Sequence, residues 1–525
     1  MAIDLPPVEA VTAQPTPAWT THAEQQGGYQ YRGSDKRIRV YGAHDVARHR
    51  DLDEVLADCR DAKAVEEALV THFRDIGLLN IQIATVTRGD LIVAYVRDEG
   101  LTAVEGPEPL RPYFDRFADG EPIAYSDFAK RRRLAELHAR RAGFEPYATY
   151  RHGDGAETTM KIGVEEIRGS AWDWSAGLNN AGTRYFGRWT AHAGASRTSL
   201  DAFRIGLGVR HALPEFGDDA SDARYDKVSA FVDQVTRWGV VRADASYARF
   251  EYNDTGSGRR GELPLTPADG PRYDGRRWQA SLSAEHLLYE SPNWRWSFRE
   301  GVGTSRYRID DVRTDAEPTD EEYSNLNAGL SARWSDGDHA LQPVVFASTG
   351  IRKGLGFGLL TRDAQEDFLA VHSNGGVAGD IGDLGRLVVT VKGQHSTDPL
   401  PEQEEWVLGG SQRLSAWLPG VIVGDRGALG RAQFTAPVHG SGFGNLALHL
   451  AWEIGYAEFA RENDAESTRR TLSNAEIGLT LTHHSQWQLS LVTARPTGEK
   501  NVDPDYLDRQ RADFFLSLSR RWQAP

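Results

Sequence analysis

The stretch Trp278-Gln279-Ala280-Ser281-Leu282-Ser283-Ala284-Glu285 alternates strictly between apolar and polar side chains. Successive side chains of a β-strand point to opposite faces, so this stretch predicts a strand with one apolar and one hydrated face. The alternation recurs over 294–299 and over 514–521, and the polar faces repeatedly carry arginines and carboxylates. Charged inner faces suit a water-filled lumen, whereas a soluble β-sandwich, the alternative fold, would concentrate its aromatic residues in a core. We therefore predict a transmembrane antiparallel β-barrel over residues 167–525.

The size of this region sets the number of strands. Strands of about 9 to 11 residues with their turns need about 20 to 22 residues each, which predicts about 16 strands. A barrel of that size is wide enough to enclose a channel, so it needs a plug or an inserted loop to stay closed.

Residues 35–166 have a different pattern of apolar residues. Here the patterns of strands and helices occur twice in the order β-α-α-β-β. The first copy spans 35–100 and the second spans 101–166. Gly77 and Gly143 follow the second helical stretch of each copy, where a glycine commonly ends a helix. The repeat predicts two small tandem α+β domains, each with a three-stranded sheet covered by two helices.

Composition excludes several classes of protein. The 525 residues carry a formal net charge of −15, and the mean hydropathy is −0.52. The acidic balance disfavours nucleic acid as a partner. No window reaches the roughly 18 consecutive apolar residues of a membrane-spanning helix, whereas a barrel can have a low average hydropathy. Cys59 is the only cysteine, which excludes an intrachain disulfide and a cysteine-based zinc site.

Residues 1–34 are rich in Pro, Ala, Gln and Gly and have weak periodicity, so we expect a linker with at most one short helix. The first seven residues lack the basic and apolar regions of an export signal. The sequence is therefore interpreted as a mature or engineered form.

Motifs of catalytic and cofactor-binding proteins are not found. His483 and His484 are neighbours in a predicted strand and point to opposite faces, so they cannot chelate one metal ion together. Gly354-x-Gly356-x-Gly358 lacks the helix and the downstream acid of a nucleotide fold, which favours a flexible β-turn. We expect no enzymatic activity, no cofactor and no metal. The run Lys130-Arg131-Arg132-Arg133 lies in a predicted helix, as a solvated face or as a docking patch for an acidic segment.

Two such small domains ahead of a large barrel resemble the two-partner secretion transporters of the haemolysin and filamentous haemagglutinin exporter type, within the BamA-type superfamily. The small domains resemble POTRA domains. Three local motifs support the resemblance. The stretch 178–188 is similar to the Asn-x-Gly-Ser/Thr hairpin of these transporters, although an ordinary Asn/Gly hairpin would have the same composition.

The second motif combines Leu408-Gly409-Gly410-Ser411-Gln412-Arg413-Leu414-Ser415 with Gly424-Asp425-Arg426-Gly427. It resembles the family's long loop that folds back into the lumen with an arginine at its tip, and Arg413 is at the arginine position. Gln412, Leu414 and Ser415 depart from the family pattern. The third motif, 448–455, resembles the strand in which an inward carboxylate receives that arginine, and Glu453 is at its position. The resemblance therefore implies a lumen gate in which Arg413 pairs with Glu453.

The resemblance implies an outer-membrane translocation pore that captures an unfolded exported protein in the periplasm and secretes it through the barrel. The expected partners are that exported polypeptide, a large β-rich protein, and outer-membrane lipid, and we expect the barrel to be monomeric. A helix drawn from residues 8–25 is a candidate plug for the pore. A BamA-type insertion or assembly factor is the alternative function, although such a relative usually has a different number of POTRA units. Two other classes remain as alternatives. A diffusion porin would lack the small domains. A secreted glycan-binding β-protein would stay in solution without detergent.

Overall fold

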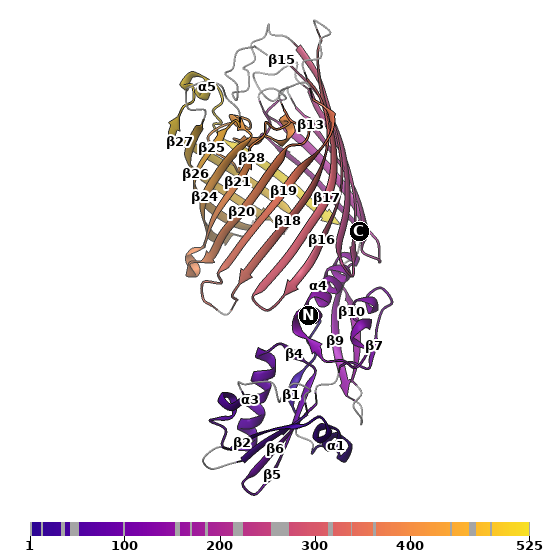
Figure 1. Cartoon of the computed structure of the whole chain (residues 1–525). Helices are drawn as coiled ribbons and strands as arrows, with labels where there is room; N and C mark the ends of the chain where they lie inside the picture. The colour runs from indigo at the N-terminus through magenta and orange to yellow at the C-terminus, as the bar shows by residue number, and fades with distance from the viewer. Residues whose placement is uncertain are drawn as a thin grey trace.

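The computed structural model shows two small domains at one end of a large barrel (Figure 1). The structure describes residues 3–523 except 12–13, 33–36, 43–51, 98–99, 153–157, 168–170, 184–186, 214–223, 254–271, 313–318, 338, 361–363, 442–443, 461–468 and 484–485. Three predictions therefore fall partly outside the described residues. They are the start of the chain at Met1 and Ala2, the centre of the predicted first hairpin at 184–186, and His484 of the histidine pair.

The first small domain contains a five-stranded sheet in the order β1-β5-β6-β3-β2. Its elements are β1 (Val8–Ala10), α1 (Pro17–Gln25), β2 (Gly28–Arg32), β3 (Arg37–Tyr41), α2 (Leu52–Leu56), α3 (Ala62–Asp75), β5 (Ile81–Arg88) and β6 (Leu91–Arg97). Helix α3 begins where the Asp61 side chain accepts a hydrogen bond from the Ala64 amide, and it is followed by Gly77 at φ 76°. One face of β6 packs toward α3, and the other face, with Val93 and Tyr95, packs toward α1.

The residues expected to form a linker belong to this first domain. β1 pairs in parallel with β5, and β2 pairs antiparallel with β3, so both outer strands of the sheet come from the first 34 residues. The candidate plug helix, α1, lies on the sheet of the first domain rather than in the barrel (Figure 1). The prediction of a linker is therefore wrong, because strands of three and five residues carry too little periodicity to be recognised, whereas the one short helix expected here is present.

The second small domain contains a three-stranded sheet in the order β7-β10-β9. Its elements are β7 (Ala103–Glu105), the 3-10 turns η2 (Arg111–Tyr113) and η3 (Asp115–Phe117), α4 (Tyr125–Ala142), β9 (Phe144–His152) and β10 (Thr158–Glu166). Helix α4 ends at Gly143, whose φ of 95° lies in the left-handed region that glycine adopts most readily.

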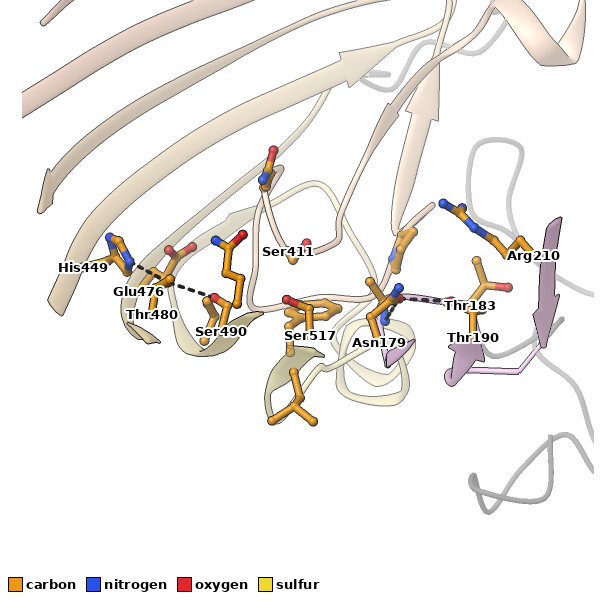
Figure 2. Close-up of a pocket in the computed structure, with 18 of the residues that line it drawn as sticks. Asn179, Thr183, Thr190, Arg210, Ser411, His449, Glu476, Thr480, Ser490 and Ser517 are labelled. Atoms are coloured by element: carbon orange, nitrogen blue, oxygen red, sulfur yellow. Dashed lines mark hydrogen bonds between the residues drawn. The ribbon is translucent and has the colours of Figure 1, made fainter. Parts of the chain in front are cut away.

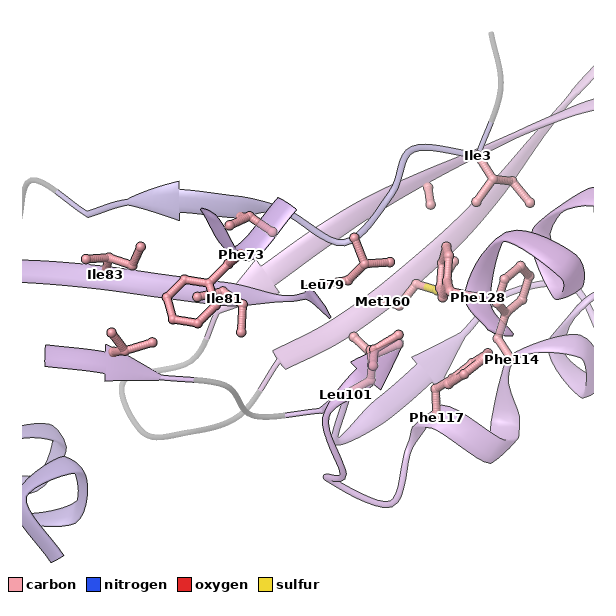
Figure 3. Packing of buried hydrophobic residues seen from close by; sticks show 14 of the residues in the cluster. Ile3, Phe73, Leu79, Ile81, Ile83, Leu101, Phe114, Phe117, Phe128 and Met160 are labelled. Atoms are coloured by element: carbon pink, nitrogen blue, oxygen red, sulfur yellow. The ribbon is translucent and has the colours of Figure 1, made fainter. Parts of the chain in front are cut away.

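The two small domains share one hydrophobic core. A short ladder between β4 (Leu78–Leu79) and β8 (Ile123–Ala124) joins them, and one continuous cluster of buried side chains runs through both. Figure 3 shows this cluster from Phe73 and Ile81 in the first domain to Phe114 and Phe128 in the second. Continuous packing of this kind favours a rigid pair over two independently moving domains.

Sixteen of the strands that follow β10 form the predicted closed antiparallel barrel, in which β28 pairs with β11 to close the cylinder. The strands are β11 (Trp172–Asn179), β12 (Thr190–Thr198), β13 (Phe203–Ala212), β14 (Arg224–Thr236), β15 (Gly239–Asn253), β16 (Arg272–Glu290), β17 (Trp294–Asp311), β18 (Thr319–Ser335), β19 (Val344–Leu359), β20 (Leu369–Asp380), β21 (Arg386–Ser396), β24 (Arg426–Ser441), β25 (Gly444–Glu458), β26 (Arg470–His483), β27 (Trp487–Lys500) and β28 (Phe515–Gln523).

The outer wall of the barrel is apolar. On β13, Ile205, Leu207 and Val209 are 47%, 62% and 53% exposed, although a water-soluble protein would bury most such side chains. Stacked tryptophans, among them Trp294 with Trp296, stand where strands begin at the end that bears the small domains. An apolar band with an aromatic girdle is the surface that a lipid bilayer requires.

Helix α4 connects the second domain to the barrel. Arg141 forms an ion pair with Asp233 of β14, and the Arg131 guanidinium donates to the Arg237 carbonyl oxygen at 2.5 Å. Within the basic run, Lys130 pairs with Asp127 at 2.7 Å, and Arg132 lies near Glu136. At least three of the four basic side chains are thus engaged within the chain itself.

Candidate functional site

The connection between β21 and β24, residues 397–425, folds back into the barrel; we call it the lumen loop. It contains η6 (Glu402–Glu404) and a small hairpin of β22 (Trp406–Leu408) and β23 (Ile422–Gly424). Trp417 at the inner end of the loop is fully buried. It belongs to a cluster with Leu429 and Leu472 of the barrel wall. The loop therefore has its own hydrophobic anchor against the inner face of β24 to β26.

The predicted Gly-Asp-Arg-Gly element fixes the point where the lumen loop returns to the wall. A Cβ on Gly424 would meet the Glu458 backbone at 2.5 Å, and one on Gly427 would meet the Trp406 ring at 2.2 Å, so neither position has room for a side chain. Asp425 is buried and accepts hydrogen bonds from the Leu400 amide at 2.7 Å and the Ala460 amide at 2.8 Å. Arg426 pairs with Glu458 at 2.9 Å. Each of the four residues thus has a separate structural role.

The first half of the lumen loop is held by the opposite part of the wall. The Tyr323 hydroxyl of β18 donates to a Glu404 carboxylate oxygen at 2.8 Å, and Arg352 of β19 pairs with the same carboxylate. The Gln394 side chain donates to the Glu404 carbonyl oxygen at 2.7 Å. The loop is therefore attached to both sides of the barrel.

The tip of the lumen loop meets a buried charged cluster on the wall, which we call the latch: Ser415, Arg431, Glu453, Asn474 and Glu476. The Ser415 amide donates to Glu453 Oε2 at 2.9 Å, and its hydroxyl donates to Glu476 Oε2 at 2.6 Å. The Asn474 side chain donates to Glu453 Oε2 at 3.1 Å. The contacts join one loop residue to side chains of two neighbouring strands, β25 and β26.

Arg431 supplies the positive charge of the latch. Its Nη1 donates to Glu453 Oε1 at 2.5 Å, and its Nη2 donates to Glu476 Oε1 at 2.7 Å. Glu453 is fully buried, and the Glu476 side chain is 2% exposed. Two carboxyl groups in such a place need a cation and hydrogen-bond donors to offset the cost of their burial, and Arg431 and Ser415 provide them.

Arg413, the predicted loop cation, does not reach Glu453 in this structure. Its guanidinium is exposed, lies over the Trp406 ring at 5.4 Å and donates to the Val407 carbonyl oxygen at 3.1 Å. The implied ion pair between Arg413 and Glu453 is therefore replaced by one between Arg431 and Glu453. Glu453 still faces the lumen and contacts the loop, through Ser415 instead.

Sequence reasoning missed Arg431, Glu476 and Ser415. Arg431 lies directly opposite Glu453 in the register of β24 and β25, so a correct alignment of these two strands would have paired them. Glu476 becomes relevant only when the register of β26 is also known. Two inward carboxylates on adjacent strands would then have required a cation close by.

A second loop covers the tip of the lumen loop from outside. It contains α5 (Pro504–Arg509), and its backbone pairs with the tip: the Leu418 amide donates to the Gln510 carbonyl oxygen at 2.8 Å, and the Ala512 amide donates to the Ala416 carbonyl oxygen at 3.0 Å. The tip is therefore enclosed between the wall and this covering loop.

Two polar cavities border the lumen loop. The first, of about 650 Å³, is lined by Ser411 of the loop together with side chains of β11 to β14 and β24 to β28; Figure 2 shows Asn179, Arg210 and Glu476 around it. The second, of about 710 Å³, lies on the side of β14 to β19 and is bordered by Glu404. The loop thus stands between two hydrated parts of the lumen.

Metal chemistry has no candidate here: over the described residues, no cluster of three or more His, Cys, Asp or Glu side chains could hold a metal ion. In the same part of the chain, no helix is long and apolar enough to cross a membrane.

A closed 16-strand barrel with a latched lumen loop, preceded by two small α+β domains, defines an outer-membrane transporter. The sequence model of the haemolysin secretion/activation protein family, ShlB/FhaC/HecB, matches residues 159–481, more than half of the chain. The chain belongs to this family of two-partner secretion transporters, which implies a secreted partner protein.

Solved structures agree with this fold. CdiB from Escherichia coli matches with a TM-score of 0.74 at 13% sequence identity, covering 98% of this chain and 100% of that chain. CdiB from Acinetobacter baumannii matches with a TM-score of 0.68 at 12% identity, covering 93% of this chain and 89% of that one. No curated protein is similar enough in sequence to match.

Proposed function

We propose that this transporter captures its unfolded partner with the two small domains, located in the periplasm, and passes it through the barrel to the outside. The barrel acts as a monomer in outer-membrane lipid. The observation that carries the proposal is the lumen loop, which lies inside the barrel and whose polar contacts with the wall at its tip are hydrogen bonds from Ser415 to Glu453 and Glu476. Hydrogen bonds of this kind can be exchanged for bonds to water or to a passing backbone.

The direction of transport comes from the partner. The sequence contains no nucleotide-binding motif, so we infer that folding of the partner outside the cell prevents its return. The partner enters as an extended chain, and the polar lining of both cavities suits backbone groups that have no partners of their own.

The proposal is tested by tying the loop to the wall. In a Cys59→Ser background, Ser415→Cys and Asn474→Cys are joined by a short, reducible bifunctional thiol reagent; the Ser415 hydroxyl and the Asn474 side-chain nitrogen are 3.1 Å apart in the native chain. We expect the tied protein to stop exporting an epitope-tagged partner and to resume after reduction. The two single-cysteine variants, treated in the same way, are the controls. Export that continues while the loop is tied would contradict the proposed route.

A different result is expected for Arg413. Because its side chain is exposed and, among the described residues, makes its polar and ring contacts with Val407 and Trp406, Arg413→Ala should change stability by less than about 1 kcal/mol and leave the loop latched. We therefore expect export close to that of the native protein, measured as surface-exposed partner. A large loss of export would show that Arg413 has a role in transport that its contacts in this structure do not reveal.

A further inference from the structure

The segment from Ile3 to Val11 runs in an extended form across both small domains. Figure 3 shows it passing from Ile3, beside the second domain, to the strand next to Ile83 in the first. Ile3 is fully buried, Pro6 is buried, and Val8 is 3% exposed, whereas Asp4 and Glu9 face solvent. The segment is therefore seated in a continuous site, which we call the peptide track.

In the second domain the peptide track lies between α4 and β9. Arg132 of α4 donates to the Ile3 carbonyl oxygen at 3.4 Å, and the Tyr150 hydroxyl of β9 donates to the Asp4 carbonyl oxygen at 2.7 Å. Burial, together with the nearby Asp4 carboxylate, raises the pKa of Tyr150, so its hydroxyl remains a donor at neutral pH. Both contacts are made to the backbone of the segment.

In the first domain the track is the edge of β5. β1 adds to it in parallel, with Val8 opposite Ile81 and Ala10 opposite Ile83. The Ile81 amide donates to the Pro7 carbonyl oxygen at 3.0 Å, the Val11 amide donates to the Ile83 carbonyl oxygen at 2.8 Å, and Arg74 of α3 donates to the Val8 carbonyl oxygen at 2.9 Å. This is strand addition to a sheet edge, again through backbone groups.

These contacts depend little on the amino-acid sequence of the segment that occupies the peptide track. At least five backbone groups of the segment are bonded, and three side chains are buried, at relative positions 0, +3 and +5. Any extended polypeptide with apolar residues at this spacing can make the same contacts. A polypeptide that is still unfolded is the kind of ligand that offers free backbone groups.

We propose that the peptide track is the docking site for an extended, unfolded segment of the secreted partner, and that residues 3–11 of this chain are a built-in competitor that the partner displaces. This inference rests on the proposed function. It adds where the partner is first bound and how the chain's own N-terminal segment limits that binding. The competitor is tethered, so its effective concentration is on the order of millimolar, and only a partner segment with several matching positions replaces it. Its strand β1 is three residues long and lies at the edge of its sheet, so few ladder hydrogen bonds have to break when it leaves.

The first test locks the competitor in place. In the Cys59→Ser background, Glu9→Cys and Gln82→Cys occupy positions that are opposite each other in β1 and β5, at a spacing that permits a disulfide. A matched control, Gln30→Cys with Arg39→Cys, places the same bond between β2 and β3 at the other edge of the sheet. We expect the first disulfide to lower export of the partner by about tenfold or more, and reduction to restore it. The control disulfide should have no effect. Native export with the β1–β5 disulfide formed overturns the proposal.

The second test needs no transport. A fluorescent peptide with the sequence of residues 3–11 is titrated into the detergent-solubilised full chain and into an Ile3→Asp, Val8→Asp variant, in which the segment should leave its site. We expect the peptide to bind the variant at least about tenfold more tightly than the native chain, and an added Tyr150→Phe substitution to weaken that binding. Equal, weak binding to both proteins overturns the track. If the native chain exports no partner but the peptide binds as expected, the peptide track is supported and the proposed function is overturned.

Discussion

Replacing Arg431 by methionine is expected to break the latch and to destabilise the folded barrel. Glu453 and Glu476 would remain buried without a cation, and breaking a buried ion pair by removing one partner costs about 3 to 5 kcal/mol. We expect the free energy of unfolding in detergent to fall by that amount. Export of the partner should fall at least about tenfold, because a barrel destabilised to this degree leaves less folded transporter in the membrane. Heat-dependent mobility in electrophoresis reports the first effect, and surface-exposed partner reports the second.

Two variants separate charge from packing. Arg431→Lys keeps the positive charge but cannot serve both carboxylates through a planar fork, so an intermediate loss is expected. Combining Arg431→Met with Glu453→Gln and Glu476→Gln removes the uncompensated charges and should recover most of the stability but not the tip contact. If Arg431→Met alone keeps native heat resistance, the carboxylates are not dependent on Arg431 and our description of the latch is wrong.

The parts of the fold that could be predicted are those with a strong repeating pattern. Alternation along 278–285 identifies a strand and its lipid-facing side, because the side-chain period of a strand is two and the two faces meet different solvents. Gly77 and Gly143 were identified as helix ends for an equally local reason, a backbone conformation that glycine adopts with little strain. The N-terminal segment could not be predicted in this way, since its strand β1 is held by an edge far along the sequence.

The site was harder to predict because its residues meet only through strand register. The Gly-Asp-Arg-Gly element can be recognised in the sequence because its four residues are consecutive, but their structural roles depend on Glu458, Trp406 and the backbone of other loops. Assigning the loop cation to Arg413 assumed that the tip follows the path seen in the family. Here Leu414 takes a φ of 70°, and it is the neighbouring Ser415 that meets the wall. The positive charge therefore comes from the wall, at Arg431.

Truncating Trp417 is expected to open the channel. Its ring is fully buried in the cluster that holds the loop tip against β24 to β26, and removing such a ring costs about 3 to 5 kcal/mol. Because the loop stands between cavities of about 650 and 710 Å³, a tip that leaves its place joins two hydrated spaces. We expect Trp417→Ala to raise the single-channel conductance or the open time in planar bilayers while the barrel still inserts. Trp238→Ala is the matched control, because Trp238 is 62% exposed in the turn between β14 and β15, and its loss should leave the conductance unchanged. A folded Trp417→Ala barrel with native conductance would show that the polar latch alone keeps the loop in the lumen, and the hydrophobic anchor would then serve stability without contributing to closure.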